Sequence, residues 1–220
     1  MKQGKLIVIE GINGCGKGTQ LSYLVDLIHG TNKSNTIFVT REPNDFDENG
    51  RKAREMLKSD GDPYENAQKA VGYFAKNRGA HNQIFVPMLE KGIHVISDRY
   101  WHSNFAFQGA QGVSYKDVAV ANRTFRIPDL TMILDVPVEV AFARLNYRDG
   151  KSRRKFDSDK DFLNEVRYRY LNLRDVLQEW LKDKNILLIN GNQSTEAVQR
   201  DVRSAYDSFY SMPPSKAKRV

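Results

Sequence analysis

Cysteine and long apolar runs are what this sequence has least of. One cysteine occurs among the 220 residues, at position 15, so no disulfide can form within the chain and a reducing compartment is expected. No uninterrupted apolar stretch approaches the roughly 18 residues that a membrane-spanning helix requires. We therefore expect a cytoplasmic protein without a membrane segment.

A broad basic face is also missing. The net charge is +7, but the segment 148–155 (RDGKSRRK) and the three basic residues of the C-terminal tail account for all of it. Nucleic-acid binding, which requires an extended basic surface, is therefore not expected. Pro213 and Pro214 stop regular structure, so residues 213–220 are predicted to form a flexible basic tail.

What the sequence does contain is a regular alternation of short apolar segments and longer helical patterns. Strands are predicted at 6–10, 36–40, 94–97, 130–134 and 186–189. Helices are predicted from residue 17 and at 51–57, 66–90, 114–124, 138–145, 162–181 and 195–210. The helix at 66–90 is expected to be interrupted or bent near Pro87. This order predicts one α/β domain over residues 1–212, with a parallel five-stranded sheet and helices on both faces.

The segment after the first predicted strand has the pattern G-x-x-x-x-G-K of a phosphate-binding loop. Its glycines allow the backbone to aim several N–H groups at one anion, and its lysine opens a helix whose positive end favours phosphate. The usual Ser or Thr after the lysine is replaced by glycine, so Mg²⁺ would depend on phosphates, water and a carboxylate elsewhere. The candidate ATP-binding residues are Gly11, Asn13, Gly14, Cys15, Gly16, Lys17, Gly18 and Thr19.

Charged residues follow the second and third predicted strands. Arg41 ends one of these strands and is either a phosphate clamp or an ordinary surface arginine. Asp98 and Arg99 end the other, where a carboxylate beside a guanidinium can serve metal and phosphate together or form a local ion pair.

Two further segments suit the recognition of a base. Phe74 and Arg78 are four residues apart on one helix face, which fits either stacking and edge recognition or a core ring beside a solvated arginine. The segment 101–109 (WHSNFAFQG) mixes aromatic residues with Ser103, Asn104 and Gln108, which fits a base site or a helix that packs its rings in the core.

In their order and spacing, these motifs resemble those of thymidylate kinases, which are P-loop nucleoside monophosphate kinases. The resemblance spans nearly the whole chain. It rests on the glycine loop and on TREP at 40–43, FAxxR at 74–78, DRY at 98–100, SNxAFQG at 103–109, PDL at 128–130, LDVP at 134–137 and VRxxYL at 166–171. It implies transfer of the γ-phosphate of MgATP to dTMP, giving dTDP and ADP, in a homodimer.

The resemblance also implies a role for each matching residue. Lys17 binds ATP phosphates, Asp98 organises Mg²⁺, and the peptide bond before Pro43 is cis. Phe74 stacks on thymine, Arg78 reaches its O4, and Asn104 meets its N3 side. The implied dTMP-binding residues are Arg41, Phe74, Arg78, Arg99, Ser103, Asn104, Phe107 and Gln108, and the implied catalytic residues are Lys17, Asp98, Arg99, Arg153 and Arg154.

The chain departs from the family pattern at several of these positions. Asn13 and Asn77 stand where many members carry an acid, and Phe107 replaces a frequent tyrosine near the sugar. Residues 148–158 are expected to form a lid that supplies arginines to the phosphates, with Arg153 and Arg154 as the candidates; a solvated basic loop is the alternative.

Other functions remain open at this stage. A deoxynucleoside kinase or another nucleoside monophosphate kinase shares the glycine loop, although a nucleoside kinase would carry a Glu-Arg-Ser context that the sequence lacks. A P-loop module that binds nucleotide without catalysis is the alternative from another class. The choice between dTMP and dUMP is not decided by the sequence.

Overall fold

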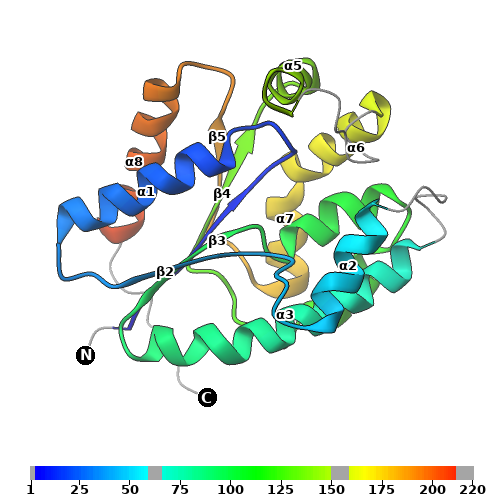
Figure 1. Cartoon of the computed structure of the whole chain (residues 1–220), viewed down its shortest axis with the longest axis horizontal. Helices are drawn as coiled ribbons and strands as arrows, with labels where there is room; N and C mark the ends of the chain where they lie inside the picture. The colour runs from blue at the N-terminus through cyan, green and yellow to red at the C-terminus, as the bar shows by residue number, and fades with distance from the viewer. Residues whose placement is uncertain (1–2, 59–65, 150–158, 212–220) are drawn as a thin grey trace.

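The computed structural model describes residues 3–58, 66–149 and 159–211. Five parallel strands form one sheet in the order β2-β3-β1-β4-β5 (Figure 1). They are β1 (Leu6–Glu10), β2 (Ile37–Arg41), β3 (His94–Asp98), β4 (Leu130–Asp135) and β5 (Ile186–Asn190). The predicted five-stranded parallel sheet is therefore confirmed, and each predicted strand lies within one residue of its observed bounds.

Strand β1 occupies the centre of the sheet. It pairs with β3 on one side and β4 on the other, and all five of its residues are buried. A strand covered on both faces needs apolar side chains throughout, which explains its uninterrupted run LIVI. Because the strands are parallel, their carboxyl ends lie at one edge, and this brings the segments that follow β1, β2 and β3 together.

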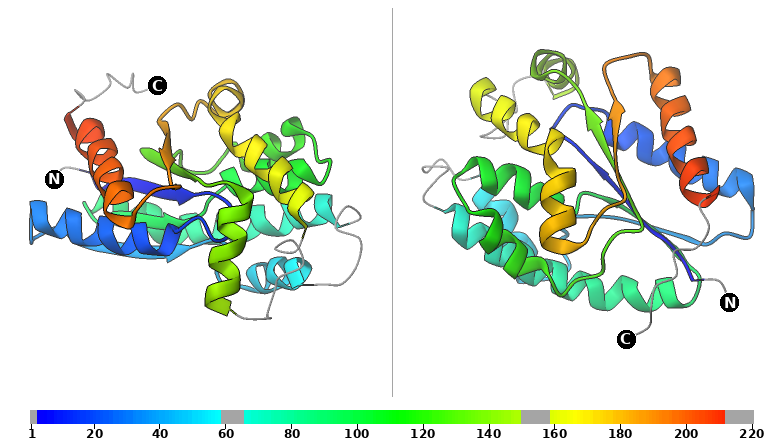
Figure 2. Two further views of the ribbon diagram at one scale, coloured as in Figure 1. Left: turned by 90° about the horizontal axis from the view of Figure 1, so that it is seen from above. Right: turned by 180° about the vertical axis from the view of Figure 1, so that it is seen from behind.

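Helices cover both faces of the sheet, as predicted (Figures 1 and 2). Helices α1 (Lys17–Thr31) and α8 (Thr195–Ser211) pack together on one face. The other helices are α2 (Glu48–Lys58), α3 (Ala67–Glu90), α4 (Tyr115–Asn122), α5 (Val138–Asp149), α6 (Lys160–Leu171) and α7 (Leu173–Leu181), with a π-helical turn η1 at Asn104–Gln108. Of these, α3 packs on β3 and α6 on β4, and both contact η1.

Two helix predictions require correction. The single helix predicted over 162–181 is two helices that meet at Asn172, whose side-chain Nδ2 donates to the carbonyl of Tyr168. The change of direction brings Leu173, Leu177 and Leu181 into the core at a spacing of four residues. The helix predicted over 66–90 was expected to be interrupted or bent near Pro87; the interruption is absent, because α3 continues through Pro87 to Glu90.

In the described part of the chain, no helix combines the length and apolar character needed to cross a membrane.

Candidate functional site

The phosphate loop connects β1 to α1 and has the backbone that its glycines predict. Gly14 and Gly16 adopt positive φ angles of 82° and 101°. A Cβ atom at Gly14 would lie 2.4 Å from the carbonyl oxygen of Ala141, so only glycine fits this close approach of the loop to α5. Cys15 is buried, whereas Gly18 and Thr19 are exposed in the first turn of α1.

Lys17 folds back over this loop. Its Nζ donates to the carbonyl oxygens of Gly11 and Ile12, each at 3.0 Å, and the residue is buried. Burial, reinforced by the nearby charge of Arg99, lowers the pKa of Lys17. An anion at the loop would stabilise this buried ammonium, which has lost its hydration by water, so the loop suits a phosphate.

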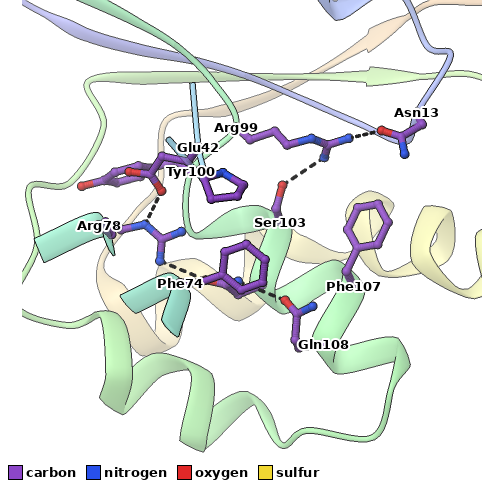
Figure 3. A pocket seen from close by; sticks show the side chains of 11 residues that line it. Asn13, Glu42, Phe74, Arg78, Arg99, Tyr100, Ser103, Phe107 and Gln108 are labelled. Carbon is purple, nitrogen blue, oxygen red and sulfur yellow. Dashed lines mark hydrogen bonds and ion pairs between the residues drawn. The ribbon is translucent and has the colours of Figure 1, made fainter. Parts of the chain in front are cut away.

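Arg99 lies beside the loop, immediately after β3 (Figure 3). Its Nη2 donates to Oδ1 of Asn13 at 2.7 Å. Its Nη1 donates to the hydroxyl groups of Ser103 and Tyr170, at 3.0 and 3.1 Å. The guanidinium also stands over the ring of Phe107, 5.3 Å from its centroid. These contacts hold the cation in one orientation at the end of the sheet.

Glu10 is a site residue that the sequence analysis missed. It is fully buried at the end of β1, where Oε1 accepts from the backbone N–H of Tyr100 at 2.7 Å. Its Oε2 accepts from the hydroxyls of Ser103 and Tyr170, at 2.8 and 2.9 Å. It also lies 3.6 Å from Nη1 of Arg99. Burial, together with the charge of Glu10, raises the pKa of Tyr170, so this phenol stays protonated as a donor.

A cavity opens between the end of the sheet, α3 and η1 (Figure 3). Of the eight residues predicted to bind the acceptor, the structure brings seven together here; Arg41 is absent from the lining. The cavity is lined by Asn13, Glu42, Pro43, Phe74, Arg78, Arg99, Tyr100, Ser103, Asn104, Phe107 and Gln108. It therefore joins an aromatic and amide-lined end to the cationic end at Arg99.

Arg78 forms the floor of the aromatic end and is almost fully buried. Its Nε donates to Oε2 of Glu42 at 2.7 Å, and its Nη1 donates to Oδ1 of Asn104 at 2.9 Å. Nη1 also donates to Oδ1 of Asn122. The Glu42–Pro43 peptide bond is cis, as expected. The carboxylate that orients Arg78 therefore comes from the end of β2.

Asn77, which replaces an acid common in the family, acts elsewhere. Its Oδ1 accepts from the backbone N–H of Asn44 at 3.1 Å, and its Nδ2 donates to Oδ1 of Asp47 at 2.8 Å. Asn77 therefore connects the segment after β2 to α3, and Glu42, rather than residue 77, orients Arg78.

Arg41 and Asp98 face each other in the register of β2 and β3. Arg41 is exposed, and one carboxylate oxygen of Asp98, Oδ1, is buried without a hydrogen-bond partner. Within residues 3–58, 66–149 and 159–211, no three His, Cys, Asp or Glu side chains are grouped to hold a metal. A single free carboxylate oxygen beside a phosphate loop suits Mg²⁺, which keeps water and phosphate ligands.

Arg153 and Arg154 lie outside the described residues, as do most of the expected lid and the tail.

Known proteins resemble this chain along nearly its whole length. The model of the thymidylate kinase family matches residues 9–202. A probable thymidylate kinase of Thermococcus gammatolerans is 33% identical over 207 residues, which cover 90% of this chain and 94% of that protein. The thymidylate kinase of Nitrosomonas eutropha is 29% identical, with 100% of both chains covered. A solved structure of thymidylate kinase from Candida albicans has the same fold, with a TM-score of 0.73 and 21% identity over 94% of this chain and 92% of that one.

Proposed function

The chain belongs to the thymidylate kinase family, and from this premise we propose that it transfers the γ-phosphate of ATP to dTMP, giving dTDP and ADP. One observation carries the proposal: a single cavity joins an aromatic and amide-lined end, at Phe74 and Arg78, to a fixed cation, Arg99. A nucleoside monophosphate has this same distribution of ring and charge.

The aromatic end selects the base. The ring of Phe74 covers the base plane, while Arg78 offers a donor to O4 of thymine and the oxygen of Asn104 accepts from N3–H. Cytosine and adenine carry an amino group in place of that carbonyl, which sets two donors against each other. An unpaired buried donor costs about 1–3 kcal/mol, and more where a charged group is involved, which corresponds to roughly a tenfold to several-hundredfold preference for thymine.

The cationic end holds the acceptor phosphate. Arg99 is already oriented by Asn13, Ser103 and Tyr170, so its side chain loses little conformational entropy when it binds a phosphate. Arg41, exposed at the end of the neighbouring strand β2, is the second proposed phosphate ligand. Both guanidinium groups stabilise negative charge on the acceptor side of the transfer.

The donor side is built on the loop. Lys17 exchanges its contacts with the carbonyls of Gly11 and Ile12 for oxygens of the ATP phosphates. Asp98, whose Oδ1 is buried without a hydrogen-bond partner, would hold Mg²⁺, and the ion would supply positive charge to the phosphates. Through the lid, Arg153 and Arg154 add positive charge to the same phosphates.

From the family resemblance we also propose that the active form is a cytoplasmic homodimer.

The test measures ADP release from MgATP with dTMP, dUMP, dCMP, AMP and thymidine as acceptors. We expect the highest kcat/KM with dTMP, with dCMP and AMP at least tenfold lower. Arg78→Lys keeps the charge but loses the planar guanidinium. In this variant the ratio of kcat/KM for dTMP to kcat/KM for dCMP should fall. Equal turnover of AMP and dTMP would overturn the acceptor assignment. Faster turnover of thymidine than dTMP would identify a nucleoside kinase, and no acceptor-dependent turnover would identify a binding module.

A further inference from the structure

Three amide side chains extend in single file from Arg78. Its Nη1 donates to Oδ1 of Asn104 at 2.9 Å, and Nδ2 of Asn104 donates to Oε1 of Gln108 at 3.0 Å. Nε2 of Gln108 then donates to Oε1 of Gln111 at 3.1 Å. All four side chains belong to buried residues. We call this file the amide relay.

The first member of the relay favours one direction. A guanidinium has donors and no acceptor, so Arg78 meets the oxygen of Asn104. The amide nitrogen of Asn104 then points to Gln108, which presents its oxygen there and its own nitrogen to Gln111. A carboxamide's shape alone leaves its orientation ambiguous, and the charge of Arg78 favours the observed orientation of each amide without being the only contact that holds it.

The relay crosses the wall of the base cavity. Asn104 and Gln108 come from η1 and line the cavity, whereas Gln111 lies outside the lining. The backbone N–H of Gln111 donates to the carbonyl of Phe107 at 3.1 Å, which continues the turn of η1 and sets the distance between the two glutamines. Gln111 therefore acts on the base through Gln108 and not by direct contact.

We propose that Gln111 is a positioning residue that sets which pyrimidine the cavity accepts. Through Gln108 it holds Asn104 with the oxygen toward the base, where it meets the N3–H of thymine or uracil. Cytosine presents an unprotonated N3 and would need the nitrogen of Asn104 there instead. The inference rests on the proposed function, which it deepens by assigning base choice to a residue that does not touch the base.

Arg78 alone does not prevent Asn104 from turning over. If Asn104 turned, Nη1 of Arg78 would keep its contact with Oδ1 of Asn122. The nitrogen of a reversed Asn104 would face Nη1 of Arg78, which sets two donors against each other, and Gln108 would have to turn as well to offer its own nitrogen to the reversed amide. The oxygen of Gln111 adds to this cost, because it engages the nitrogen of Gln108 on the far side. Loss of that acceptor thus lowers the cost of the cytosine-compatible orientation.

The experiment compares Gln111→Met and Gln111→Ala, which remove the acceptor, with Gln111→Glu, which keeps one. For each, kcat/KM is measured with dTMP and with dCMP in the same preparation, so the fraction of active protein cancels from the ratio. One hydrogen bond of this kind corresponds to about a threefold to tenfold change in the ratio of kcat/KM for dTMP to kcat/KM for dCMP. We expect the ratio of dTMP to dCMP to fall by about that factor in the Met and Ala variants and to stay within about twofold of the parent in Gln111→Glu.

An unchanged ratio in the Met and Ala variants, with both activities lowered together, would overturn the inference and leave Gln111 a structural residue. An equal fall of the ratio in Gln111→Glu would also overturn it, because the acceptor would then be irrelevant. These outcomes are distinct from a failure of the proposed function, which would appear in the parent as the absence of a preference for dTMP.

Discussion

Oδ1 of Asn13 lies 2.7 Å from Nη2 of Arg99, so an uncharged amide joins the phosphate loop to the end of β3. An acid at this position, common in related proteins, would neutralise part of the arginine's charge. With Asn13 the guanidinium is oriented but keeps its charge, and the nearest carboxylate, Glu10, is 3.6 Å from Nη1.

Asn13→Ala tests this orienting contact. Arg99 keeps its bonds to Ser103 and Tyr170, so we expect the low end of the range for a charged hydrogen bond, about 1.5 kcal/mol, or roughly a tenfold rise in KM for dTMP with a smaller change in kcat. Steady-state kinetics at saturating ATP measures it. Asn32→Ala, an exposed change at the far end of α1, is the control. A KM for dTMP equal to that of the control would show that Asn13 does not prepare Arg99.

The buried pair of Arg78 and Glu42 predicts a stability effect separate from catalysis. Arg78→Met leaves the carboxylate of Glu42 with His81 as its remaining side-chain partner, at 2.9 Å, and should lower the free energy of unfolding by about 3–5 kcal/mol. Urea denaturation measures it. Arg203→Ala breaks an exposed pair with Asp207 and should cost less than about 1 kcal/mol. Similar losses in the two variants would contradict the buried-pair assignment.

Lys17→Met separates stability from activity. Because the folded pKa of Lys17 lies below its ordinary value of 10.5, the unfolded chain binds more protons, and stability rises with pH from the folded pKa up to about 10.5. The variant has no ammonium at position 17 and therefore lacks this pH dependence of stability. It should therefore be as stable as the parent or more stable near neutral pH, with the difference shrinking at alkaline pH, while kcat falls at least a hundredfold. Urea titrations at several pH values, with kinetics at pH 7.5, measure both. A variant that is less stable than the parent at neutral pH would contradict this account.

The sheet and most of the cavity lining were predictable because their signals are local. The run LIVI and the glycine loop identify β1 and its turn, and seven of the eight predicted acceptor residues line one cavity. Glu10 was not predictable, since its partners Ser103 and Tyr170 are 93 and 160 residues away along the chain. The pairing of Arg78 with Glu42 was not predictable either, because Glu42 follows β2 and lies 36 residues before Arg78 in the chain.

The division of the predicted helix 162–181 has a different cause. Neither proline nor glycine marks position 172, and the pattern of leucines on both sides suits a continuous helix. Asn172, whose side chain caps the carbonyl of Tyr168, is the one local sign of the break, and the burial of Leu173 in the core after it depends on contacts with distant parts of the chain.

Arg153 and Arg154, which we propose to act from a lid, give the last prediction. Arg153→Ala and Arg154→Ala should lower kcat more than they raise KM for ATP, because an arginine that meets the transferring phosphoryl group acts mainly in the transition state; such residues contribute on the order of 10³ in rate. Single variants and the double variant are compared in the coupled assay. Lys216→Ala, in the basic tail, is the matched control for the loss of one charge. Unchanged kcat in the double variant would remove both residues from catalysis.

The position of β1 in the sheet has a consequence for how the protein is made. All eleven residues that line the cavity lie between positions 13 and 108, so a ribosome synthesises every one of them in the first half of the chain. The second neighbour of β1, β4, begins only at Leu130. Until that segment emerges, the central strand has one unpaired edge, which is the kind of edge that pairs with other chains. Nascent chains that stall between these two points thus carry every residue of the cavity lining together with an open sheet edge.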